Sequence, residues 1–221
     1  MPQSIVIAFG LFLWSTFAFA QTDKLSPEKR TQLEAATARF MAKNNLPGIS
    51  IDAGTGALQF IAETNTGTLP VALAINRDGK YLYVLDQSSK NIAGFLIDAV
   101  TGQLEPVPHC PFGVTETLYS VATDPAGNHL YGGDSSTIIG YRIFDPMGNL
   151  HRLSGSPFSG VLGAYGLSLD LSSSFLYGAN NSGNTVSAFQ VDADGNLRIL
   201  NDSPYSAGTN AASVTVVSSF Q

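Results

Sequence analysis

A short aromatic motif that occurs three times constrains the fold more than any other feature of this chain. It reads Tyr-Leu-Tyr-Val at 81–84 and Leu-Tyr-Gly at both 130–132 and 176–178. The shared tyrosines, Tyr83, Tyr131 and Tyr177, are separated by 48 and 46 residues, a period typical of β-propeller blades. Because propellers host many activities, the repeat predicts the fold and does not by itself predict a function.

Each repeat is expected to hold four short antiparallel strands. In the first repeat, β-forming residues favour strands at 71–75, 81–85, 92–97 and 103–107, separated by turns rich in Gly, Asn and Asp. The sequence therefore predicts an all-β fold, a β-propeller of four-stranded antiparallel blades. The blades are expected at 68–114, 115–160 and 161–208.

Two further signatures recur at the same period. An aspartate opens the turn before each fourth strand, at Asp52, Asp98, Asp145 and Asp192. We interpret these residues as turn caps and not as calcium ligands, because only the last copy carries a second carboxylate. A Cys/Ser-Pro-aromatic sequence begins at Cys110, Ser156 and Ser203. Cys110 is therefore expected to fill a serine position and not to act as a nucleophile.

The number of blades is too small for a complete ring. The three full repeats are preceded by the tail of another blade at 51–64 and followed by one expected inner strand at 212–218. A blade shared between these two ends would lack its second strand and leave backbone edges unpaired. The propeller at 51–221 is then a strained four-bladed ring or an open arc, and an arc is expected to associate with a second copy. We favour a seven-bladed domain that lost its first half at a junction near Ser50.

The first 50 residues differ from the repeats. An apolar stretch at 5–17 followed by Ala18-Phe19-Ala20 is typical of a signal peptide at 1–20, which predicts a secreted or periplasmic protein. Its length falls short of the roughly 20 apolar residues that span a bilayer. Residues 21–50 are expected to form a helical leader, because Ser26 and Pro27 are typical of a helix start and apolar residues follow at helical spacing.

The composition excludes some classes of partner. The formal net charge is −6 and charged residues make up 13% of the chain, which argues against binding to nucleic acid or to an anionic membrane. The single cysteine excludes an intramolecular disulfide.

The blade motifs carry a family resemblance. The sequences Asp-Gly-Lys-Tyr-Leu-Tyr-Val at 78–84, Ile-Asp-Ala-Val-Thr-Gly-Gln-Leu at 97–104 and Gly-Ser-Pro-Phe at 155–158 resemble the lactonase, or 6-phosphogluconolactonase-like, family of seven-bladed propellers. That group merges with repeat proteins named for a Tyr-Val-Thr-Asn motif. The resemblance implies the fold from 51 to the C-terminus, and these blade-building motifs say less about catalysis.

The leader carries a second, shorter resemblance. Residues 26–50 are similar to the N-terminus of serine β-lactamase-related hydrolases. The only Ser-x-x-Lys sequence there, Ser26 to Lys29, lies at the expected helix start, and the other catalytic motifs of that family are missing. We do not expect activity of that type.

Ligands of propellers usually bind at the central channel, where the first strands of the blades begin, so the candidate site residues are those expected there. Lactone hydrolysis, which the lactonase resemblance implies, needs a base to activate water and donors to polarise the carbonyl. The candidate catalytic residue is Glu116, and the candidate ligand-binding residues are Thr68, Tyr119, Tyr165 and Asn210. Tyr119 and Tyr165 align with Val71, at the start of a first strand.

The three histidines are not expected to form a site. His129 aligns with Lys80 at an exposed turn exit, His151 falls on an outer strand, and His109 precedes a Pro-Phe connection. Because these positions in the blade differ, no metal and no cofactor are expected.

Three functions remain open. The sequence favours an exported lactonase-like repeat protein that acts as a binding or scaffold module with little catalysis. The alternative is a lactonase that hydrolyses a sugar lactone, and the third interpretation is a nonfunctional truncated fusion product. The candidate partners are a small-molecule, carbohydrate or lactone ligand and a second copy of the chain.

Overall fold

The computed structural model describes residues 4–8, 48–52, 58–59, 64–144 and 146–216, and these residues are folded as strands and turns. They form four antiparallel sheets. Three of the sheets correspond to the three sequence repeats, and the expected all-β propeller architecture is confirmed. The predicted helix within 21–50 lies outside the described residues.

Blade 1 contains β4 (Pro70–Ile75), β5 (Tyr81–Asp86), β6 (Asn91–Ile97), β7 (Leu104–Pro106) and β8 (Phe112–Gly113). Blade 2 contains β9 (Ser120–Thr123), β10 (His129–Gly133), β11 (Thr137–Phe144), β12 (Asn149–Arg152) and β13 (Phe158–Ser159). Blade 3 contains β14 (Ala164–Leu169), β15 (Phe175–Asn180), β16 (Thr185–Val191), β17 (Leu197–Ile199) and β18 (Tyr205–Ser206). In each blade the first four strands pair in chain order.

The fourth strand of each blade is split into two pieces. In blade 1 both β7 and β8 pair with β6, and the other blades repeat this arrangement. The Cys110 sulfur fills the gap between the two pieces by accepting the backbone N–H of Gly94, at 3.1 Å. The hydroxyls of Ser156 and Ser203 accept the equivalent N–H groups at 3.1 and 2.9 Å. The interpretation of Cys110 as a serine substitute is therefore confirmed.

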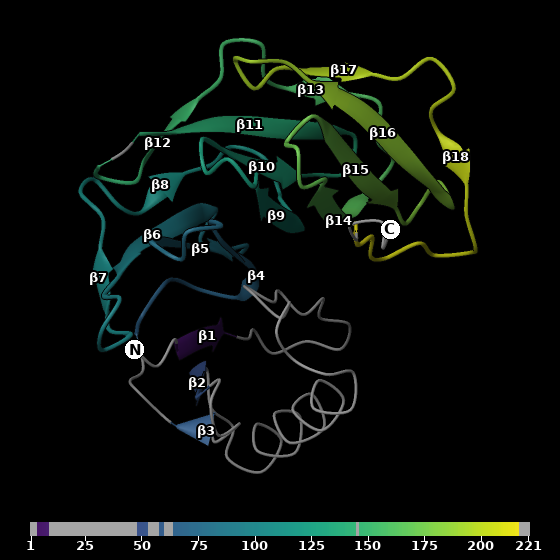
Figure 1. Ribbon diagram of the computed structural model, residues 1–221. Helices are drawn as coiled ribbons and strands as arrows, with labels where there is room; N and C mark the ends of the chain where they lie inside the picture. The colour runs from purple at the N-terminus through teal and green to yellow at the C-terminus, as the bar shows by residue number, and fades with distance from the viewer. Residues whose placement is uncertain (1–3, 9–47, 53–57, 60–63, 145, 217–221) are drawn as a thin grey trace, which may run out of the picture.

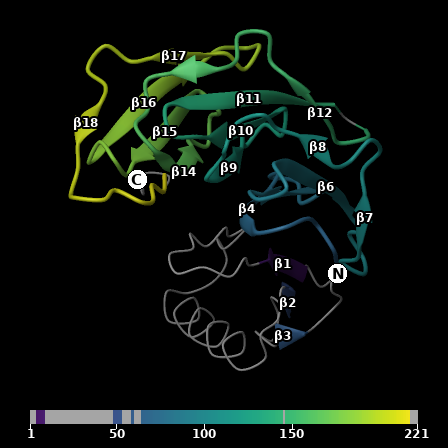
Figure 2. The ribbon, with the colours of Figure 1, turned by 180° about the vertical axis from the view of Figure 1, so that it is seen from behind.

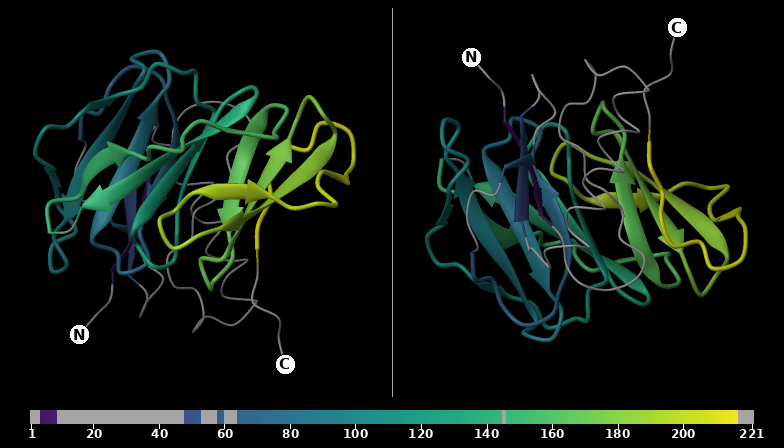
Figure 3. Two further views of the ribbon diagram at one scale, coloured as in Figure 1. Left: turned by 90° about the horizontal axis from the view of Figure 1, so that it is seen from above. Right: turned by 90° about the horizontal axis from the view of Figure 1, so that it is seen from below.

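The three blades lie side by side along an arc, with the inner strands β4, β9 and β14 on its concave side (Figures 1 and 2). Seen from above and below, the sheets stack face against face (Figure 3). One apolar core joins blade 1 to blade 2, through buried side chains such as Tyr83, Leu130 and Ile139. A second core joins blade 2 to blade 3, through Tyr131, Leu176 and Phe189 among others.

The repeated tyrosine also bonds each blade to the next. The Tyr83 hydroxyl donates to the carbonyl of Gly148 in blade 2, and the Tyr131 hydroxyl donates to that of Gly195 in blade 3, both at 2.8 Å. Burial raises the pKa of both tyrosines, so the hydroxyls remain protonated donors. Both acceptor glycines have positive φ, 72° and 85°, a conformation that glycine adopts without strain.

The fourth sheet, here called the N-terminal sheet, contains β1 (Ser4–Ala8), β2 (Gly48–Asp52) and β3 (Leu58–Gln59), in the order β1-β2-β3. By sequence, β2 and β3 correspond to the third and fourth strands of a blade. Strand β1 therefore occupies the position of the second strand, although residues 4–8 carry no blade motif. Strand β1 falls within the predicted signal peptide, so the N-terminal sheet belongs to the chain that keeps residues 1–20. Export stays a prediction.

The predicted closing strand at 212–218 is not assigned as a strand over its described residues, up to 216. The segment nevertheless lies against the inner strand of blade 3. A side chain at Gly166 would collide with the backbone of Ala212 and Ser213, and the Val216 N–H donates to the Ser168 hydroxyl at 3.2 Å. This is the place of the first strand of a following blade.

Candidate ligand site at the start of the inner strands

The candidate ligand-binding residues lie at one end of the arc. Thr68 precedes β4, Tyr119 precedes β9, and Tyr165 is the second residue of β14. Asn210 precedes the segment that runs along β14. Because the inner strands begin at equivalent positions in each blade, all four residues are at the end of the blades where those strands start.

Two of these residues touch each other. The rings of Tyr119 and Tyr165 stack with centroids 4.5 Å apart and an angle of 7° between their planes. Tyr165 sits at a register shift between Ala164 and Gly166, and blade 1 has the same irregularity at Val71. The predicted alignment of Tyr165 with Val71 is thus confirmed. Tyr165 remains 43% exposed, so the pair presents an accessible aromatic surface.

Thr68 and Asn210 are exposed, and the backbone N–H of each bonds to the turn between the second and third strands of blade 1 or blade 3. The Thr68 N–H donates to the hydroxyl of Ser89, and the Asn210 N–H donates to the Asn184 side-chain oxygen at 2.7 Å. Among the described residues, no hydrogen bond joins either of them to the tyrosine pair. The structure therefore places all four at one end and brings only the tyrosines into contact.

The candidate catalytic residue Glu116 forms an ion pair. Its carboxylate pairs with Arg152 of the outer strand β12, at 2.7 Å, and accepts the Thr115 hydroxyl at 2.8 Å. Partial burial opposes ionisation, but these hydrogen bonds outweigh it and lower the pKa of Glu116. A carboxylate held in this way is a weak base.

The Glu116–Arg152 pair borders a pocket of about 370 Å³ between the outer parts of blades 1 and 2. His109, Thr115, Tyr141 and Arg152 are among its lining residues. The pocket is therefore lined by outer strands and connections, and neither stacked tyrosine contributes to its wall.

Asp86, the last residue of β5, was not among the predicted site residues. Its side chain is fully buried, one oxygen accepts the Thr66 hydroxyl at 2.7 Å, and the other has no hydrogen-bond partner in the described part of the chain. Burial raises the pKa of this carboxyl. Because Asp86 pairs with Pro70 at the start of β4, it lies at the same end as the stacked tyrosines. Its repeat partners Asp134 and Asn180 could have drawn attention to this polar position.

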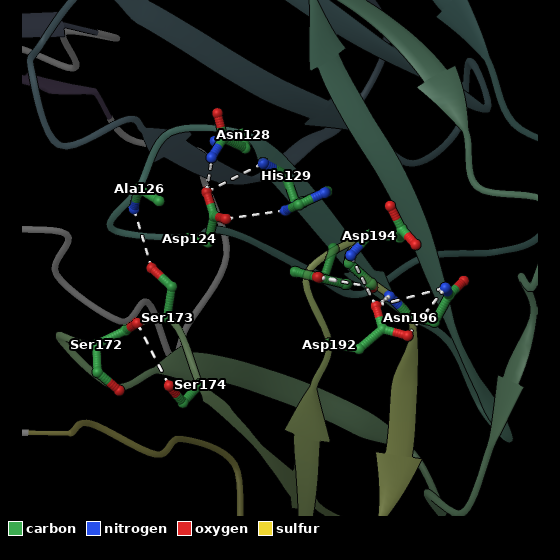
Figure 4. Close-up of polar contacts among 12 residues, drawn as sticks. Asp124, Ala126, Asn128, His129, Ser172, Ser173, Ser174, Asp192, Asp194 and Asn196 are labelled. Carbon is green, nitrogen blue, oxygen red and sulfur yellow. Dashed lines mark hydrogen bonds and ion pairs between the residues drawn. The ribbon is translucent and has the colours of Figure 1, made fainter.

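The expectation for His129 was wrong. The strand register places His129 opposite Arg142, which makes it the counterpart of Tyr81 and not of Lys80. The ring is 6% exposed, bonds through Nδ1 to Asp124 at 2.9 Å, and packs against Gly195 of blade 3 (Figure 4). His129 is thus part of the contact between blades.

Two of the aspartates at the turns accept hydrogen bonds from backbone N–H groups, as expected of turn caps. Asp98 accepts the N–H groups of Val100 and Thr101, and Asp192 accepts those of Asp194 and Asn196 (Figure 4). No group of metal-ligating side chains gathers among the described residues. Nor does that part of the chain hold a helix long and apolar enough to cross a membrane.

Comparisons with known proteins agree with this architecture. Residues 28–118 match the family model described as lactonase, seven-bladed β-propeller. The resemblance to the lactonase propeller family is confirmed. No curated protein gave a significant match.

Three solved structures show the same fold at low identity. They are a 6-phosphogluconolactonase candidate from Bacteroides fragilis (TM-score 0.62, 16% identity, 75% of this chain and 49% of that chain), another from Bacteroides uniformis (0.60, 16%, 73% and 51%), and the periplasmic gluconolactonase of Pseudomonas aeruginosa (0.56, 16%, 74% and 52%). The chain spans about half the length of the solved structures that it matches. Their similarity shows the fold only and does not assign their activities to this chain.

Proposed function

We propose that the protein binds sugar lactones on the Tyr119–Tyr165 surface and hydrolyses them. The observation that carries this proposal is the stacked, exposed tyrosine pair at the start of the inner strands of a lactonase-type propeller. An aromatic face offers a flat apolar surface with a negative quadrupole, which suits the C–H face of a sugar ring.

The reaction requires a base near the bound ring. Water adds to the lactone carbonyl carbon, the ring C–O bond breaks, and the proton taken from water returns to the alcohol that leaves. Among the described carboxylates, Asp86 fits the base better than Glu116, because Asp86 has a raised pKa and lies at the same end as the tyrosines. A base with a pKa nearer to neutrality is more effective. Because Asp86 is buried, residues 66–69 must move to expose it.

The second candidate is ligand binding without catalysis. It is favoured by one observation: Asp86, the candidate base, is fully buried and is not accessible to a ligand on the tyrosine surface. Binding and hydrolysis therefore need separate measurements.

The test uses glucono-δ-lactone and its 6-phosphate with the full chain. We expect Tyr165→Ala and Tyr119→Ala to weaken binding in calorimetry by about tenfold, the value of one lost aromatic contact of ~1.4 kcal/mol. Tyr205→Ala is the matched control, because Tyr205 is similarly exposed and lies on the outer strand β18. Equal losses in all three variants, or no binding by the native chain, would contradict the proposed site.

Hydrolysis is followed as acid release at constant pH. Asp86→Asn should abolish turnover and leave binding unchanged. Glu116→Gln should retain most of the turnover of the native chain. Loss of turnover only in Glu116→Gln would reverse the assignment of the base. Binding with no turnover in the native chain would select the second candidate.

A further inference from the structure

The contact between blades is made twice in this chain from the same parts. A tyrosine in the second strand of one blade donates to a turn glycine of the next, as Tyr83 does to Gly148 and Tyr131 does to Gly195. Both tyrosines are fully buried by the neighbouring blade. The interface is therefore a repeated unit in which one blade supplies the donor and the following blade supplies the cover.

In the part of the chain that the structure describes, blade 3 presents the donor half of this interface and no further blade covers it. Tyr177 occupies the position of Tyr83 and Tyr131, yet it is only partly buried and has no hydrogen-bond acceptor among the described residues. Tyr205, the counterpart of Phe158 in blade 2, is 46% exposed where Phe158 is 8% exposed. This surface, here called the open face, continues an established interface.

The N-terminal sheet has a strand edge that is unpaired among the described residues. Its strand β1 pairs with β2 on one side, and no described strand pairs with its other edge. That edge is where the first strand of a blade belongs. The described residues 211–216 lie beside β14 in the place of such a first strand. The N-terminal sheet lies next to blade 1, at the opposite end of the arc from the C-terminal segment (Figures 1 and 2).

We propose that the open face binds a second copy of this chain, head to tail. The N-terminal sheet of one copy covers Tyr177 of the other, and residues 211–216 pair with the free edge of β1 in the covering sheet. An unpaired strand edge is a ready template for such pairing. With two-fold symmetry, the same contact forms twice and closes the ring, leaving no open end.

The size of the assembly fits a propeller. The described residues form four sheets, so two copies hold eight, and propellers contain roughly four to eight blades. Two copies therefore supply about as many blades as one complete ring. This proposal does not rest on the proposed lactonase activity.

The test is sedimentation velocity of the full chain, residues 1–221 confirmed by mass, over a hundredfold range of concentration. We expect a discrete species of twice the chain mass that Tyr177→Arg abolishes. Leu171→Arg is the matched control, because Leu171 is an exposed apolar residue of the same blade in the turn between β14 and β15. A monomer at every concentration, or unchanged association of Tyr177→Arg, would overturn the proposal.

An isosteric variant covers the case in which Tyr177→Arg does not fold. Tyr177→Phe removes only the hydroxyl and should raise the dissociation constant about two- to tenfold, the range for one hydrogen bond. Tyr83→Phe should leave that constant unchanged, because its hydroxyl is already bonded within the chain. Equal effects of the two variants would contradict a specific role for Tyr177.

The direction of docking is tested by cross-linking. A photoreactive phenylalanine in place of Tyr205, in an equal mixture of light and 15N-labelled chains, should cross-link to peptides containing 48–59. Mixed light–heavy products are the expected result. Products joined only within one chain would show that the ring closes without a partner and would reject the second copy.

Discussion

Blades 2 and 3 are built from the same repeat and differ in how many of their faces are covered. Blade 2 packs against a neighbour on both sides, so Tyr131 is fully buried and bonded to Gly195. Among the described residues, blade 3 packs against another blade on one side only, and Tyr177 lacks that bond. The comparison teaches that one repeat encodes two half-interfaces, each of which contributes stability only when the complementary half is present.

The largest expected difference between the two blades is at the repeated tyrosine. Tyr131→Ala should lower the free energy of unfolding by about 3–5 kcal/mol, because it removes a buried aromatic side chain and leaves a cavity. In dilute protein, Tyr177→Ala should lower the free energy of unfolding by less than half of that amount, because the open face is partly exposed to solvent. Urea unfolding of both variants at low concentration measures the difference. Equal losses would mean that the open face is already covered within one chain.

The turn glycine that accepts the tyrosine bond gives the next largest effect. A side chain at Gly148 would approach the Tyr81 ring to 2.6 Å, and Gly148 has a φ of 72°. Gly148→Ala should therefore cost about 2–4 kcal/mol, which combines left-handed strain with overpacking. Gly79→Ala is the control, because Gly79 has a φ of 71° and no atom near its would-be side chain. It should cost only about 1–2 kcal/mol, and thermal unfolding should separate the two.

The sequence was sufficient for the blades because their signals are local. The Leu-Tyr motif, the capping aspartates and the Cys/Ser-Pro positions each act within one blade, and the period of the repeat aligns them. The alignment was wrong at His129. It was shifted by one residue and assigned His129 to the exposed position of Lys80, whereas His129 occupies the buried position of Tyr81. Strand pairing fixes that register, and a repeat motif of a few residues does not.

The site was less predictable than the blades. The position of Tyr119 and Tyr165 followed from the repeat, but their mutual stacking depends on two neighbouring blades. Glu116 was placed by its distance along the chain from a first strand, and its pairing with Arg152, 36 residues away, is a tertiary contact that no local pattern reveals. The burial of Asp86 depends on the loop at 66–69 and was missed for the same reason.

A smaller effect is expected at the gap in each fourth strand. Ser156→Ala should cost about 1 kcal/mol, because the Gly140 N–H loses its acceptor. Cys110→Ser should be close to neutral, since serine fills this position in the other two blades. Chemical unfolding of the two variants tests whether the blades are equivalent here. A loss in Cys110→Ser as large as that in Ser156→Ala would show that blade 1 depends on sulfur specifically.

The smallest expected effect is the pH dependence at the end of the second strand, where blade 1 has Asp86 and blade 3 has Asn180. Asn180 donates to Thr185 and Ser187, whereas one oxygen of Asp86 lacks a partner among the described residues. Because burial raises the pKa of Asp86 above its unfolded value of 3.8, folding favours the protonated form. Its contribution to stability is present below that value and is lost as the pH rises through the folded pKa.

Asp86→Asn should remove this loss, so the variant gains stability relative to the native chain as the pH rises from 4 to 7. Urea unfolding at several pH values measures the difference. If the native chain instead gained on the variant, the carboxylate would have to be stabilised by a partner in the folded state, and blade 1 would resemble blade 3 at this position.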